Sequence, residues 1–115
     1  MTPDFQRQLE RMHTSAMLWA DRAAALTGAD ARRKNEIAAR IEQQVAAHLP
    51  HTLEPSRSIL LRSAATLFIR AGSPALAVKA AAAGLLGSPP PAIADELMQV
   101  IALSGDLAMN DDERG

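Results

Sequence analysis

Apolar residues recur at three- and four-residue steps along most of the chain, which is the period of a helix with one buried face. The first such stretch predicts a helix over residues 3–26, with Thr2 as its N-cap and Pro3 at its first position. Gly28 is expected to end this helix. The face that it buries is predicted to consist of Phe5, Leu9, Met12, Ala16, Trp19, Ala20 and Ala23.

A second helix is predicted over residues 30–49, with Asp30 as its N-cap and a proline directly after its end. Its apolar stripe is expected to consist of Ile37, Ile41, Val45 and His48. The linker at 50–55 carries a proline at each end. Because a short turn joins the first two helices, they are predicted to form an antiparallel hairpin over about 3–49.

Glycine and proline divide the rest of the chain into shorter helices. Two helices separated by Gly72, the second one capped by Ser73, predict another hairpin over about 56–88. A run of three prolines then precedes a helix over about 91–104. The acidic residues 105–115 are expected to form a frayed tail.

The composition indicates an all-α fold. The chain is 48% hydrophobic but only 3% aromatic, so its core must be built mainly from alanine and aliphatic residues. Alanine packs well where backbones approach closely, as in helices in tight contact, whereas sheets favour β-branched and aromatic residues. We therefore expect one domain, residues 1–115, with about five helices in antiparallel hairpins.

Residues 58–91 resemble one tetratricopeptide repeat (TPR), a helical hairpin of about 34 residues. The positions that carry the resemblance are Leu61, Ala64, Ala65, Phe68, Gly72, Ala77, Gly84 and Pro89. Ala81 departs from the pattern, because a large aromatic residue is common at that place. The whole chain also resembles small uncharacterised bacterial proteins of similar layout. The resemblance implies a TPR-like right-handed stack in which 3–49 is a degenerate copy and 91–104 is a capping helix.

This resemblance implies a protein–protein interaction or adaptor module with a concave groove lined by the first helix of each hairpin. The side of the third helix that would face the groove carries Arg62, Thr66, Ile69 and Arg70. We expect these residues to contact a protein or peptide. Two arginines can hold a carboxylate through forked hydrogen bonds, which favours an acidic partner. The alternative is a solvated polar face without a ligand.

Self-association is a further expectation, because two hairpins make a short stack whose apolar ends need cover. The first helix carries more large apolar side chains than a stack of two hairpins is expected to bury. A homodimer through this helix would bury Phe5, Leu9, Met12 and Trp19. The alternative for Trp19 is an ordinary core position.

The runner-up function is a small helical DNA-binding or regulatory protein. Arg32, Arg33 and Lys34 form a basic cluster near the start of the second helix. A net charge of −1 counts against binding to nucleic acid, because such proteins usually carry a basic excess. The cluster also fits an exposed turn that is partly balanced by Asp30 and Glu36.

No pattern in the sequence indicates catalysis. His48, His51 and Glu54 are spaced as H-x-x-H-x-x-E, but Pro50 interrupts the helix between the histidines, so we expect no metal site. His13 has no partner close to it in the sequence. Without a glycine-rich phosphate loop or a nucleophile motif, we expect neither a cofactor nor enzymatic activity.

The remaining features bear on the compartment. The chain contains no cysteine, which excludes disulfides. Its first residues are charged and do not read as a signal peptide, and it has no uninterrupted apolar run of about twenty residues, the length of a membrane span. A cytoplasmic location is therefore expected.

Overall fold

The structure is a computed structural model that describes the backbone of residues 1–114 and the side chains of residues 1–108. These residues form helices and no strands, which confirms the all-α prediction. The helices are α1 (Pro3–Ala24), α2 (Gly28–Ala47), α3 (Ser56–Arg70), α4 (Pro74–Leu85) and α5 (Pro91–Arg114).

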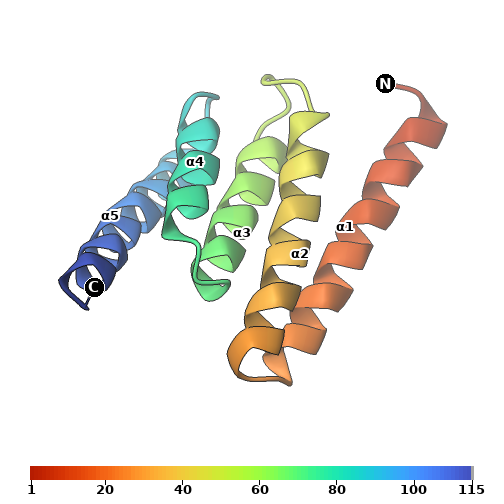
Figure 1. Cartoon of the computed structure of the whole chain (residues 1–115). Helices are drawn as coiled ribbons and strands as arrows, with labels where there is room; N and C mark the ends of the chain where they lie inside the picture. The colour runs from red at the N-terminus through yellow and green to blue at the C-terminus, as the bar shows by residue number, and fades with distance from the viewer. Residues whose placement is uncertain (115) are drawn as a thin grey trace.

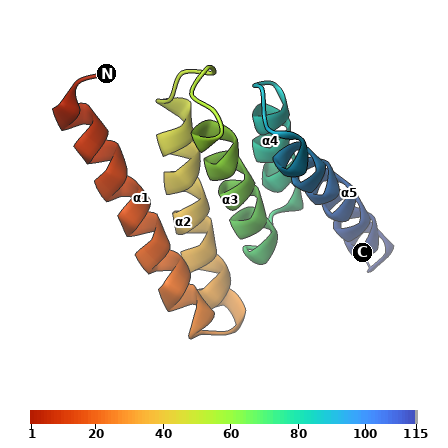
Figure 2. The same ribbon diagram turned by 180° about the vertical axis from the view of Figure 1, so that it is seen from behind.

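Successive helices lie side by side and run in opposite directions, as Figure 1 shows. Each helix packs on the next, and α5 packs on α3 as well as on α4. The resulting slab measures 49 × 30 × 18 Å. Figure 2 shows from behind that α1 and α2 meet at their connecting turn and diverge toward the N-terminus. Within the described residues α1 is not packed along α3, so the surface of α2 between them is left open on one side.

Most helix ends follow the proline and glycine signals. The Oγ1 atom of Thr2 accepts a backbone hydrogen bond of 3.1 Å and caps α1 as predicted. Gly72 joins α3 to α4 with a φ of 75°, a left-handed conformation that glycine adopts without strain. Gly28 is the first residue of α2 rather than a stop for α1, and Thr27 rather than Asp30 occupies the N-cap position.

The predicted end of the C-terminal helix was wrong. A helix over 91–104 followed by a frayed tail was expected from the sequence, but α5 continues to Arg114. Ser104 is 1% exposed and Leu107 is half-buried, so this helix remains packed beyond the expected end. A glycine such as Gly105 costs a helix only about 1 kcal/mol relative to alanine. Residue 115 lies outside the described residues.

The core is built largely from alanine, as the composition predicted. Its completely buried alanines are Ala16, Ala38, Ala39, Ala64, Ala65, Ala77, Ala80 and Ala81. Gly84 allows a close approach of helices, because a Cβ atom added there would lie 2.8 Å from Cδ1 of Leu97 in α5. The preceding helix α3 also lies close, with Cβ of Leu61 at 3.5 Å from the same position.

The buried face of α2 differs from the predicted stripe. Ile37 and Ile41 are half-buried and His48 is exposed. The buried residues are Asn35, Ala38, Ala39, Glu42, Val45 and Ala46. Because α2 is packed between α1 and α3, small residues suit the positions where the three helices approach most closely. The same geometry buries the carboxylate of Glu42 inside the helix layer.

Candidate functional site

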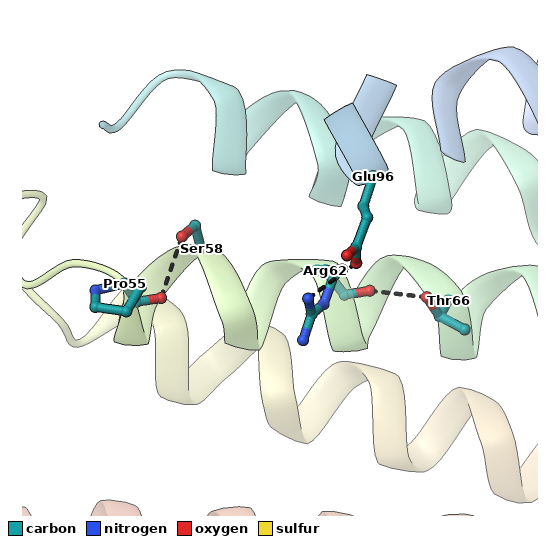
Figure 3. Close-up of polar contacts among 5 residues, drawn as sticks. All are labelled: Pro55, Ser58, Arg62, Thr66 and Glu96. Atoms are coloured by element: carbon teal, nitrogen blue, oxygen red, sulfur yellow. Dashed lines mark hydrogen bonds and ion pairs between the residues drawn. The ribbon is translucent and has the colours of Figure 1, made fainter. Parts of the chain in front are cut away.

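The arginine ridge predicted on α3 is largely engaged within the chain. Nη1 of Arg62 donates a 2.9 Å hydrogen bond to Oε2 of Glu96 in α5, as Figure 3 shows. The hydroxyl of Thr66 donates to the Arg62 carbonyl at 3.0 Å. Ile69 is half-buried against the core, and Arg70 is exposed. Arg62 is thus paired with Glu96 while Arg70 is exposed, and the acidic partner stays a prediction.

The α1 face predicted for self-association packs mainly against its own chain. Leu9 is only 5% exposed, so the expectation that the rest of the chain leaves it uncovered was wrong. The ring of Phe5 meets His48 edge-on, with 5.4 Å between ring centroids. Trp19 packs against the core and lies 5.5 Å from the Arg22 guanidinium. Met12 is half-buried as well.

The basic cluster at the start of α2 is not a uniformly exposed patch. The Cδ atom of Arg32 lies 3.3 Å from the position that a Cβ atom at Gly72 would occupy, so Arg32 packs against the turn between α3 and α4. Lys34 is half-buried, whereas Arg32 and Arg33 are exposed. Part of this cluster therefore serves the packing of α2 against the second hairpin.

A groove of about 720 Å³ lies between α1 and α3, over the C-terminal half of α2. We call it the α1–α3 groove. Its apolar lining includes Leu9, Val45, Leu49, Leu53, Ile59 and Leu60. Leu53 is 43% exposed and Ile59 is 38% exposed, so apolar surface faces solvent within a concave site. Concave apolar surface of this kind is typical of ligand and partner sites.

One wall of the α1–α3 groove is the linker between α2 and α3, which is held by Glu54. Oε2 of Glu54 accepts hydrogen bonds from the Ser58 hydroxyl at 2.6 Å and from the Ser58 backbone N–H at 3.3 Å. The Pro55 carbonyl is a second acceptor for that hydroxyl at 3.1 Å (Figure 3). The carboxylate thereby caps the positive N-terminus of α3 and fixes the linker that carries Leu53.

A buried carboxylate lies one helical turn from the groove lining. Glu42, three residues before Val45 on α2, is completely buried, and its Oε1 lies 2.8 Å from Nδ1 of His13 on α1. Its Oε2 has no hydrogen-bond partner among the described residues. Burial raises the pKa of Glu42, and the contacts with His13 and the Ser63 hydroxyl lower it by less. The His13 side chain lines the groove, so it separates Glu42 from the open space.

Neither Glu42 nor the α1–α3 groove was predicted from the sequence. His13 has no partner close to it along the chain, because Glu42 lies 29 residues away. A usable signal was present, since Glu42 stands at helical spacing between Ala38, Ala39 and Val45. A charged residue inside a stripe of small and apolar residues indicates a buried polar contact with another helix.

Among the described residues, no three His, Cys, Asp or Glu side chains come together in a way that could hold a metal ion. In the same part of the chain, no helix combines the length and apolar character that a membrane crossing requires. The chain matches no family model, no curated protein and no solved structure.

Proposed function

We propose that this protein is a protein–protein interaction module with a TPR-like stack, and that its α1–α3 groove binds the apolar face of an amphipathic helix from another protein. The observation that carries the proposal is the exposure of Leu53 and Ile59 inside a groove of about 720 Å³. Apolar side chains in a concave site gain free energy when a partner covers them.

A helix fits this groove better than an extended peptide. An extended segment would bring unpaired backbone N–H and C=O groups against leucine and isoleucine side chains, which is costly. A helix satisfies those groups internally and presents an apolar stripe. The groove follows α1 from Met1 to Thr14, which at the helical rise is about 20 Å, or three to four turns of a partner helix.

The arrangement of the C-terminal helices supports the TPR-like part of the proposal. α5 packs against both helices of the preceding hairpin, as the next helix in a stack of hairpins does. Gly72 forms a left-handed turn between α3 and α4, and Gly84 lies where α4 comes close to Leu97 of α5. The open space between α1 and α3 is then a place where the stack leaves room for a partner.

Selection from a random peptide display library, with the full chain as bait, tests the proposal. Ile59→Glu places a charge on the groove wall at a position that is 38% exposed. Met98→Glu makes the same change on α5, at a position that is 51% exposed and outside the groove. We expect the enriched peptides to lose about tenfold or more in affinity for Ile59→Glu, because a buried charge opposes an apolar contact. Met98→Glu should bind them as the wild type does.

Two outcomes would contradict the proposal. The first is a library that yields no enriched peptides, or peptides that bind both variants equally. The second is that another copy of this chain occupies the groove, as in the homodimer expected from the sequence. If sedimentation shows a wild-type dimer that Ile59→Glu converts to a monomer, the groove is a homodimer interface rather than a site for another protein.

A further inference from the structure

Few ionisable groups line the α1–α3 groove. Among the described side chains these are Glu10 and His13, and Met1, which carries the N-terminal amino group, also belongs to the lining. Glu42 is 0% exposed and contacts His13, with 2.8 Å between Oε1 and Nδ1. A partner that enters this groove therefore meets one carboxylate and one histidine directly, and it reaches Glu42 only where His13 moves aside.

Glu42 retains unused hydrogen-bonding capacity at a position without solvent. Its side chain is 0% exposed, and although the Ser63 hydroxyl is close enough to lower the pKa of Glu42, no hydrogen bond to Oε2 forms in the described structure. His13 offers its ring Nδ1 to one oxygen only. A lysine ammonium carries three N–H donors and an arginine guanidinium five, so either group can satisfy both carboxylate oxygens.

His13 can leave this position when another group replaces its contact with Glu42. Its side chain is 47% exposed, against 0% for Glu42, so a change of rotamer moves the ring toward solvent rather than into the core. Two arginines of the flanking helices are already engaged in the described structure, since Arg7 pairs with Asp4 and Arg62 pairs with Glu96. Neither is free to take the place of His13.

We infer that the partner helix carries a lysine or arginine beside its apolar stripe, and that this cation displaces His13 and pairs with Glu42. The inference rests on the proposed function of the groove and specifies the chemistry of its partner. The apolar stripe covers Leu53 and Ile59, and the basic residue lies about one helical turn away, because Glu42 stands three residues before Val45 on α2. Glu42 is then the residue that selects among amphipathic helices.

The peptides enriched on the wild-type chain provide the test. We expect a lysine or arginine at a fixed spacing from their apolar positions. Replacing that residue by methionine in one enriched peptide should weaken its binding to the wild type by about tenfold, as is typical of a lost charge-assisted hydrogen bond. The same replacement should have little effect on binding to Glu42→Gln, so the two changes should be coupled in a double-mutant cycle. His13→Ala should bind the basic peptide as tightly as the wild type or more tightly.

The outcomes separate this inference from the function on which it rests. If the enriched peptides lose affinity for Ile59→Glu but show no preference for lysine or arginine, the proposed function of the groove stands and this inference is overturned. Equal losses for the methionine peptide on the wild type and on Glu42→Gln would also overturn it. The comparison of the two peptides on the wild-type chain tests the basic preference by itself, because it changes the peptide alone, and Glu42→Gln then shows whether Glu42 rather than Glu10 is the partner of the basic residue.

Discussion

The substitution Glu42→Gln is expected to stabilise the fold at mildly alkaline pH and to leave it unchanged in acid. Burial raises the pKa of Glu42, so the folded chain holds this proton more tightly than the unfolded chain does. The free energy of unfolding therefore decreases as the pH rises from the usual carboxyl pKa of about 4.3 through the raised value. Glutamine keeps the shape and can donate to or accept from Nδ1 of His13, but it never carries the charge.

The magnitude follows from two opposing contributions. A buried carboxylate with one unpaired oxygen costs about 1–3 kcal/mol. The His13 side chain is 47% exposed, so solvent screens its attraction to the carboxylate, and we take that contribution as about 1 kcal/mol or less. The net gain from Glu42→Gln is about 1–2 kcal/mol. For 115 residues this raises the melting temperature by about 4 °C for each kcal/mol.

Thermal unfolding followed by circular dichroism across this pH range measures the effect. Glu10→Gln is the matched control, because Glu10 is an exposed carboxylate on the same groove and its neutralisation should change little. A Glu42→Gln variant that melts below the wild type at alkaline pH would show that the His13 contact outweighs the cost of burying the charge. The reasoning would then be refuted.

Two further predictions concern the second hairpin and its neighbour. Gly84→Ala should destabilise the fold by about 1–3 kcal/mol, because the added Cβ would lie 2.8 Å from the completely buried Leu97; an unchanged urea midpoint would show that α5 moves away at no cost. Arg62→Met should change the free energy of unfolding by less than about 1 kcal/mol, because its ion pair with Glu96 is partly exposed. A larger loss on thermal unfolding would assign this pair a structural role.

The helices could be predicted from the sequence because their ends carry local signals. Thr2 and Gly72 act through their own backbone and side-chain chemistry, which does not depend on the rest of the fold. The end of α5 could not be predicted in this way. Gly105 is a weak local stop, whereas the burial of Ser104 against other helices is a tertiary effect.

The candidate site was less predictable than the fold. Leu9, Val45 and Leu60 look like ordinary core residues in the sequence, and they line a groove because α1 and α3 are held apart. That separation is a property of the packed layer and has no local signal. Likewise, the pairing of Arg62 with Glu96 joins residues 34 positions apart, and no helical periodicity connects them.

The most direct test of the central claim is a nuclear magnetic resonance titration of the full chain with an enriched peptide. If the α1–α3 groove binds the peptide, the methyl signals of Leu53, Ile59 and Leu60 should shift together, while those of Leu86 and Met98, which are exposed elsewhere, should stay in place. Shifts confined to Leu86 and Met98, with the groove signals unmoved, would contradict the account.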